Sequence, residues 1–121
     1  MCKISALYNN DFVVEQGTSG IWTYRKWNSG IAECWGMTSL KTYDVTTASG
    51  KGYFCDVNTI VFPTSLFSAG ITHIDATANS GGLIWCMVGG YSYNAVAVRL
   101  CSPNATTTAV RMQISAKGKW K

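Results

Sequence analysis

Apolar and polar residues alternate with a period of two along most of the chain, as in β-strands whose two faces meet different surroundings. The segment "IWTYRKW" at 21–27 is the clearest case. One face carries Trp22, Tyr24 and Lys26, and the other carries Ile21, Thr23, Arg25 and Trp27. Aromatic and β-branched residues on both faces favour a strand.

The next segment continues this pattern and predicts a β-hairpin. The loop at 28–30 ends in Gly30, where a tight turn usually needs a positive φ, and it joins 21–27 to "IAECWGM" at 31–37. Some apolar residues of the second segment also fit a helical spacing. However, Gly30 and Gly36 bracket it too tightly for a helix of ordinary length, so we predict a strand.

Shorter apolar runs separated by turn residues fill the rest of the chain. They predict strands at 40–46, 53–62, 71–77, 83–88, 94–101 and 107–116. The segments between them are rich in turn-forming residues, and Pro63 ends one strand because proline cannot donate a hydrogen bond within a ladder. About eight short strands without a convincing helix indicate an all-β sandwich or barrel.

The composition favours one folded domain. Of 121 residues, 47% are apolar and 13% are charged, which is typical of a loop-rich β protein. The net charge of +4 comes largely from the segment 111–121 and is too sparse for a nucleic-acid footprint. The start of the chain lacks the core of a signal peptide, and the longest apolar run, 83–88, is too short to cross a bilayer. We expect neither nucleic-acid binding nor membrane insertion.

The cysteines indicate free thiols rather than disulfides or a metal site. They are Cys2, Cys34, Cys55, Cys86 and Cys101. Their odd number, the lack of C-x-x-C spacing and their position in apolar runs are typical of buried thiols made in a reducing compartment. The single histidine, His73, is more simply explained as a surface side chain than as a ligand, so we expect no metal and no cofactor.

Candidate catalytic residues are few. The six carboxylates are scattered along the chain: Asp11, Glu15, Glu33, Asp44, Asp56 and Asp75. A pair brought together by the fold, as in glycosidases, stays open, whereas a catalytic triad would have to use His73. The glycine pairs at 81–82 and 89–90 lack the lysine of a phosphate loop. We expect a protein without enzymatic activity.

The loop "GGYSYN" at 89–94 is a candidate binding surface. It places Tyr91 and Tyr93 beside Asn94. Aromatic rings stack on the apolar face of a sugar and amide groups meet its hydroxyls, so this combination suits a glycan. The alternative is that both tyrosines are ordinary strand or loop aromatics that support a neighbour.

Three blocks of the sequence carry a resemblance to a known family. They are "DFVVEQGTSGIWTYRKWNSGIAECWG", "FPTSLFSAGITHIDATANSGG" and "AVRMQISAKGKWK". Together they resemble the C-terminal head domain of bacteriophage and prophage tail-fibre and receptor-binding proteins, especially those of Gram-positive hosts. The first block is the most specific, and the looser blocks are also similar to H-type lectins. The resemblance covers 11–121 as a single head domain and leaves 1–10 as a lead-in.

The resemblance implies an antiparallel β-sandwich that assembles into a homotrimer at the distal end of a fibre and contacts host cell-surface carbohydrate. It gives the predicted hairpin a structural role in packing and oligomer contacts, through Trp22, Tyr24, Trp27 and Trp35. Arg25 would pair with Glu33 either across the two strands or between protomers. Receptor contact is then expected in the loops between later strands, including the "SPNAT" loop with Asn104.

The resemblance also implies a place in the virion. The protein would be made in the bacterial cytoplasm, released by lysis, and joined to the remainder of a tail fibre or baseplate. Because only 1–10 precede the matching region, an isolated head or a short gene product detached from a fibre is the other expectation. A purely structural virion or fibre-assembly protein, without glycan binding, remains the alternative function.

Overall fold

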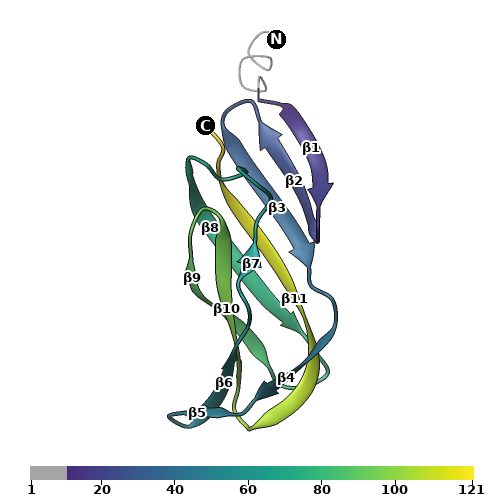
Figure 1. Ribbon diagram of the computed structural model, residues 1–121, viewed down its shortest axis with the longest axis vertical. Coiled ribbons are helices and arrows are strands. Elements are labelled where there is room, and N and C mark those ends of the chain that lie inside the picture. The colour runs from purple at the N-terminus through teal and green to yellow at the C-terminus, as the bar shows by residue number, and fades with distance from the viewer. Residues whose placement is uncertain (1–10) are drawn as a thin grey trace, which may run out of the picture.

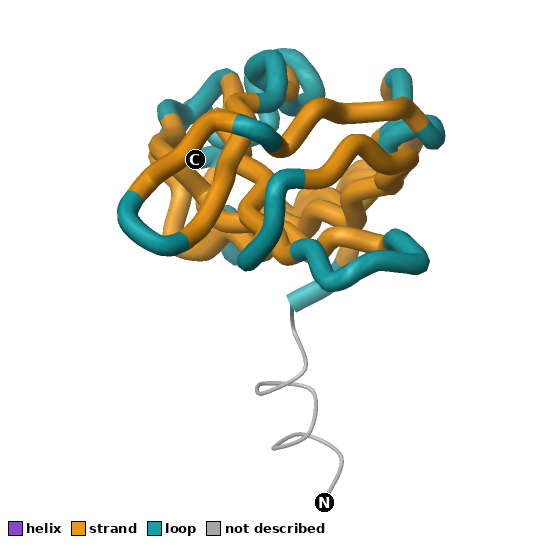
Figure 2. The backbone as a smooth tube through the Cα atoms, turned by 90° about the horizontal axis from the view of Figure 1, so that it is seen from below, coloured by secondary structure: helices purple, strands orange, loops and turns teal. Residues whose placement is uncertain are grey.

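The computed structural model describes residues 11–121, so the predicted lead-in at 1–10 and Cys2 lie outside the described residues. This part of the chain consists of strands joined by loops and turns (Figure 1; Figure 2). The strands are β1 (Val13–Ser19), β2 (Trp22–Trp27), β3 (Ile31–Met37), β4 (Lys41–Val45), β5 (Thr47–Ser49), β6 (Gly52–Asp56), β7 (Ile60–Val61), β8 (Gly70–Asn79), β9 (Trp85–Tyr91), β10 (Ala95–Ser102) and β11 (Thr106–Lys119).

The larger of the two sheets is built around β11, the longest strand. β3 pairs with the second half of β11, from Gln113 to Lys119, and β4 pairs with its first half, from Thr106 to Val110. β8 lies along the other edge of β11, while β2 and then β1 extend the sheet beyond β3. Every pairing in this sheet is antiparallel.

The smaller sheet is centred on β10. β9 runs along one edge of β10, and β6 and β7 share the other edge one after the other. β5 continues the sheet beyond β6. The two antiparallel sheets face each other, which confirms the predicted β-sandwich (Figure 1).

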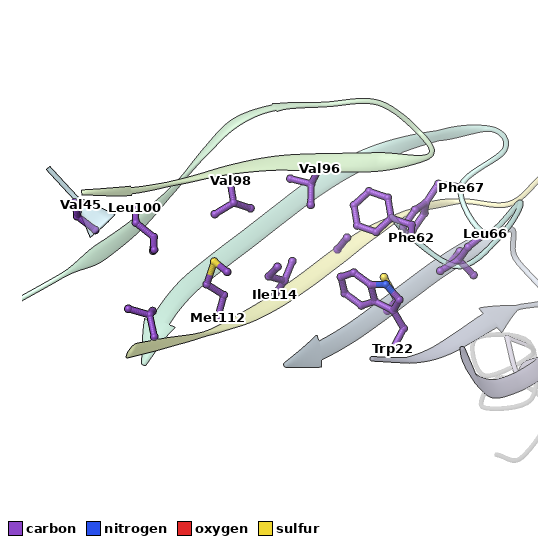
Figure 3. Packing of buried hydrophobic residues seen from close by; sticks show 14 residues of the cluster. Trp22, Val45, Phe62, Leu66, Phe67, Val96, Val98, Leu100, Met112 and Ile114 are labelled. Carbon is purple, nitrogen blue, oxygen red and sulfur yellow. The ribbon is translucent and has the colours of Figure 1, made fainter. Parts of the chain in front are cut away.

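The core lies between β10 and β11. Val96, Val98 and Leu100 on β10 point toward Met112 and Ile114 on β11, and each of these side chains is at most 2% exposed (Figure 3). Alternate residues of both strands are buried because successive side chains of a strand point to opposite faces.

Aromatic rings close one end of this core. Phe62 and Phe67 meet edge to face with their ring centroids 5.2 Å apart, and Trp22 lies 5.5 Å from Phe62 (Figure 3). Edge-to-face contacts of this kind add to the free energy gained from burial alone. The segment between β7 and β8 therefore belongs to the core, although its composition predicted only a loop.

The turn between β2 and β3 holds both ends of the described chain. Gly30 has a φ of 102°, as its position in a tight turn predicts. Its carbonyl accepts a hydrogen bond of 2.9 Å from the backbone amide of Trp120. The Ser29 hydroxyl and backbone amide donate to the Asp11 carboxylate at 2.7 and 2.9 Å, and they hold the pKa of Asp11 below its ordinary value. The two ends therefore lie at one end of the sandwich (Figure 1).

The predicted hairpin is present as β2 and β3, and the later predicted strands appear with shifted ends. Residues 11–121 contain eleven strands where about eight were expected. Two of the additions are β1 and β5, which lie at the outer edges of the sheets and have almost entirely exposed residues. Edge strands of this kind carry little hydrophobic alternation, so periodicity does not reveal them.

Two further differences come from pairing with β10. The run predicted as one strand at 53–62 is divided into β6 and β7, which pair with separate stretches of β10. β9 continues through Gly89 and Gly90 to Tyr91, where a loop was expected. A register shift between Ala97 and Val98 accommodates the extra residue on β9.

Candidate functional site

The predicted glycan-binding tyrosines lie at the β9–β10 turn. Tyr91 is the last residue of β9 and is 61% exposed, and Tyr93 in the turn is 60% exposed. The backbone amide of Ser92 donates to the Ala95 carbonyl at 2.9 Å, and the Asn94 carbonyl accepts from the Phe62 amide at 2.8 Å. The turn is thus fixed by its backbone while both phenol rings face solvent.

Asn104 lies far from this turn. It belongs to the loop between β10 and β11, where its backbone amide donates to the Ser102 hydroxyl at 3.3 Å. Tyr93 and Asn104 flank opposite ends of the eight-residue strand β10, which spans roughly 25 Å at about 3.3 Å per residue. The structure brings Tyr91, Tyr93 and Asn94 together but does not bring Asn104 to them.

The aromatic residues of the β2–β3 hairpin have different surroundings. Trp22 is 3% exposed and belongs to the core. Tyr24 is half-buried, and its hydroxyl donates to Glu15 at 2.9 Å, which raises the pKa of Tyr24 because the phenolate would lose that bond to a carboxylate. Trp27 is also half-buried and directs its Nε1 toward Glu33 Oε1 at 3.4 Å.

Arg25 and Glu33 stand opposite each other in the β2–β3 register. Their nearest nitrogen and oxygen atoms are 3.8 Å apart, so the ion pair forms within one chain. The Arg25 guanidinium also lies over Trp35, 5.1 Å from the ring centroid. Such a contact stabilises a half-exposed ring in one orientation.

Trp35 does not pack in the core. It projects from the outer face of the larger sheet, is 37% exposed, and borders a hollow of about 560 Å³. The hollow crosses β2, β3, β11 and β8, and the side chains around it include Ile21, Thr23, Met37, Asp75, Thr77, Gln113 and Ser115. Apolar, hydroxyl, amide and carboxylate groups therefore meet on one open surface.

A second, smaller hollow of about 310 Å³ lies on the same face and shares Trp35, Asp75 and Ser115 with the first. His73 belongs to its lining, and its Nε2 lies 2.7 Å from Asp75 Oδ2. Both side chains are well exposed, at 64% for His73 and 67% for Asp75. The contact fixes the direction of the Asp75 carboxylate at the point where the two hollows meet.

Sequence reasoning missed the combination of Trp35 with Asp75 and Gln113. Each residue carries only a weak signal on its own strand, namely its place on the exposed face of an alternating pattern. The three are separated by long stretches of chain and meet only because β11 pairs with both β3 and β8. Knowledge of strand order and register was needed to find the surface.

The outer face of the smaller sheet has a different character. Trp85 and Met87 on β9 are 49% and 46% exposed, and they stand beside Arg99 of β10. Arg99 stacks on the Phe54 ring at 4.4 Å from its centroid and pairs with Asp56 at 2.7 Å. Exposed apolar groups gathered on one face are typical of a surface that binds another protein chain.

Between Asp11 and Lys121, no group of three His, Cys, Asp or Glu side chains is placed to hold a metal ion. The same residues include no helix with the length and apolarity required to cross a membrane. All four described cysteines are free thiols. Cys34 is buried, but Cys55, Cys86 and Cys101 are only half-buried, so the expectation of buried thiols is confirmed for Cys34 and wrong for these three.

Comparison with known proteins shows likeness in structure but not in sequence. No protein-family model matches the chain, and no curated protein matches it significantly. A solved structure of the P. aeruginosa R1 pyocin fibre, comprising its C-terminal residues 323–701, is similar over 89% of this chain with a TM-score of 0.67 and 13% identity. This chain has the fold of that part of the pyocin fibre. It spans 28% of the length of that fibre chain.

A second solved structure, of an N-truncated R1-type pyocin tail fibre, gives a similar result. The match covers 98% of this chain and 96% of that chain, with a TM-score of 0.66 and 11% identity. At such low identity the shared property is the fold. The expected Gram-positive host and the similarity to H-type lectins stay predictions.

Proposed function

We propose that this chain is the head of a tail fibre of a phage or a phage-tail-like particle, where it adheres to host cell-surface glycan without enzymatic activity. The observation that carries the proposal is the match of nearly the whole sandwich to two pyocin tail-fibre structures. In this role the chain is a component of the virion and connects to the remainder of the fibre or baseplate.

The arrangement of the chain ends supports this role. Asp11 and Trp120 both bind the β2–β3 turn, so the two described ends leave the sandwich together. A fibre joined through either end would leave the opposite end of the sandwich pointing away from the particle. The β5–β6 and β10–β11 loops lie at that opposite end, whereas the β9–β10 turn lies toward the end that carries the two described chain ends (Figure 1).

Homotrimer formation is part of the proposal. Three identical heads on one rigid tip raise the effective concentration of the second and third contacts, so weak sugar binding becomes useful adhesion. The exposed apolar face around Trp85 and Met87 supplies a surface that a neighbouring protomer would cover. This same face also suits the alternative of a purely structural fibre-assembly protein, which would bind no glycan.

Binding to cells and isolated glycans separates the two functions. The labelled protein is titrated onto a panel of bacterial strains and onto their purified surface polysaccharides, and saturable binding supports adhesion. Replacement of Tyr91 and Tyr93 by alanine should weaken binding without unfolding if the β9–β10 turn takes part, and unchanged binding would remove that turn from the site. Complete lack of affinity would favour the structural role. Release of new reducing ends from a bound polysaccharide would contradict the non-enzymatic assignment.

A further inference from the structure

We propose that the hollow between Trp35 and Asp75 on the outer face of the larger sheet is a binding site for a neutral saccharide. The inference rests on the proposed adhesion function and assigns a second, different surface to it. Trp35 would provide the stacking ring, and Asp75 and Gln113 would bind hydroxyl groups.

The strand register creates the space for one sugar ring. Trp35 on β3 stands opposite Ser115 on β11, and Ser115 in turn stands opposite Asp75 on β8. Trp35 and Asp75 are therefore separated by two strand spacings, or roughly 10 Å between backbones. Because Ser115 between them is small, the space above it is empty rather than filled by a side chain.

The neighbouring row of cross-strand partners, centred on Gln113, supplies further polar groups. Gln113 is opposite both Met37 on β3 and Thr77 on β8, and all three line the hollow. Amide and hydroxyl groups donate and accept hydrogen bonds in several directions, as ring hydroxyls require. The apolar side chains of Met37 and Ile21 border the same space and suit the C–H groups of a sugar.

Trp35 is held ready for stacking. The Arg25 guanidinium lies over one face of its indole and 3.8 Å from Glu33, so a sugar would stack on the opposite face of the ring. An aromatic side chain already restricted in this way loses little conformational entropy when a ligand binds. Similarly, the contact of His73 with Asp75 Oδ2 fixes the carboxylate before binding.

The charge of the hollow favours a neutral ligand over an acidic one. Asp75 is the one ionisable side chain among the residues that line it, and Arg25, which lies beside the hollow over Trp35, is paired with Glu33. A carboxylate accepts hydrogen bonds from sugar hydroxyls strongly but repels the carboxylate of an acidic sugar. The volume of about 560 Å³ lies within the range of small-molecule sites.

The expected role of Trp35 in oligomer packing is the competing explanation. Polar groups make up part of the lining of this hollow, which is shallow and open to solvent. Interface cores are depleted in charged residues, whereas Asp75 and His73 stand exposed here. The outer faces of both sheets carry exposed apolar side chains, so the oligomeric state of Trp35→Ala decides between the two explanations.

The test uses the whole chain labelled with ¹⁵N and followed by NMR. Methyl glycosides of glucose, galactose, mannose and N-acetylglucosamine are titrated to high millimolar concentration, because single-sugar contacts at shallow sites are weak, with Kd values in roughly the millimolar range. Methyl glucuronide serves as the acidic control. The Trp35 indole signal is assigned by comparison with Trp35→Phe.

Two variants test separately whether the ligand stacks on Trp35 and whether it occupies the hollow. Trp35→Ala removes the ring, and Ser115→Ile fills the floor of the hollow while keeping a residue suited to a strand. Thr42→Ile is the matched control, since Thr42 is an exposed position of β4 on the same sheet that lines neither hollow. Light scattering on each variant reports whether the oligomeric state has changed.

The expected result is a saturable shift of the Trp35 signal with at least one neutral glycoside. Methyl glucuronide should cause no comparable shift. Kd, followed in all proteins by the backbone amide signals of the residues around the hollow, should rise about tenfold or more in Trp35→Ala and Ser115→Ile, as the loss of one aromatic stacking contact predicts, and stay unchanged in Thr42→Ile. Failure of every neutral glycoside to shift the Trp35 signal would overturn the inference, as would dissociation of an oligomer by Trp35→Ala. If host cells still bind Trp35→Ala and Ser115→Ile normally, the inference falls while the adhesion function stands. If neither the wild-type protein nor any variant binds cells or glycans, both the inference and the adhesion function fall.

Discussion

The indole Nε1 of Trp22 donates a hydrogen bond of 2.7 Å to the backbone carbonyl of Val61 and thereby joins the two sheets of the sandwich. Trp22 lies on β2 of the larger sheet and Val61 on β7 of the smaller one, 39 positions later in the chain. Since β7 is a two-residue strand with few ladder bonds of its own, this side-chain bond helps to fix its position.

Replacing Trp22 with phenylalanine should lower the free energy of unfolding by about 1–3 kcal/mol. The Val61 carbonyl loses its donor, and a void opens beside Phe62 because the smaller ring cannot fill the space of the indole. Urea unfolding followed by circular dichroism measures the change. Trp35→Phe is the matched control and should shift the same quantity by less than about 0.5 kcal/mol, because Trp35 is exposed. Equal effects of the two variants would show that the Trp22 bond contributes nothing specific.

Gly36 should not tolerate a side chain, although it lies in a regular strand. It stands opposite Trp22 in the β2–β3 register, and an added Cβ would lie 2.5 Å from the Ile21 carbonyl oxygen. Because the obstacle is backbone, Gly36→Ala should lower the free energy of unfolding by about 1–3 kcal/mol. Thermal unfolding checks this against Gly81→Ala, where nothing lies within 4 Å of the added Cβ and stability should change by less than about 0.5 kcal/mol. A Gly36 variant as stable as the Gly81 variant would contradict this packing.

Much of the fold follows from periodicity, but the outward-facing surfaces do not. The β2–β3 hairpin was predictable because alternation extends along both segments and a glycine stands at the turn. β1 and β5 were not, since their residues are nearly all exposed and show no buried face. The division of 53–62 into β6 and β7 also depends on β10, a partner distant in sequence.

The candidate surfaces were predictable only in part. Tyr91 and Tyr93 share one turn, as neighbours in sequence must, but Asn104 is at the other end of β10. The hollow beside Trp35 is assembled from four strands, and its members become neighbours only through long-range register. Aromatic content predicted packing for the whole hairpin, yet the alternation of faces places Trp22 in the core and Trp35 at the surface.

The free energy of unfolding should fall as pH rises from about 9 to about 12 because of Cys34. Burial raises the pKa of this thiol to about 12, from 9.0 in an exposed setting. Below pH 9 the thiol is neutral in both states and contributes no pH dependence. Between the two values the unfolded chain releases a proton that the folded chain keeps, so stability decreases by up to about 1.4 kcal/mol per pH unit.

Urea unfolding at a series of alkaline pH values measures this slope. Cys34→Ala lowers stability at every pH by leaving a small void, but its slope above pH 9 should be shallower than that of the wild type. Tyrosines and the other thiols titrate in both proteins, so they cancel in the comparison. Parallel pH curves would mean that Cys34 does not remain a neutral buried thiol in the folded state.

The native mass in solution should be three times the chain mass of 13.1 kDa if the smaller sheet carries the oligomer contacts. Trp85 and Met87 are exposed on its outer face, and burying such side chains against a neighbouring protomer removes apolar surface from water. The double variant Trp85→Ser, Met87→Ser should therefore run as a monomer in size-exclusion chromatography with light scattering.

The matched control is the double variant Ile31→Ser, Leu40→Ser, which removes exposed apolar side chains outside that face and should leave the trimer intact. A trimer that survives the first pair and dissociates with the second would place the interface on the larger sheet rather than on the smaller one. A wild-type protein that is monomeric at every concentration would contradict trimer formation by residues 11–121 and would remove the multivalent step from the adhesion mechanism.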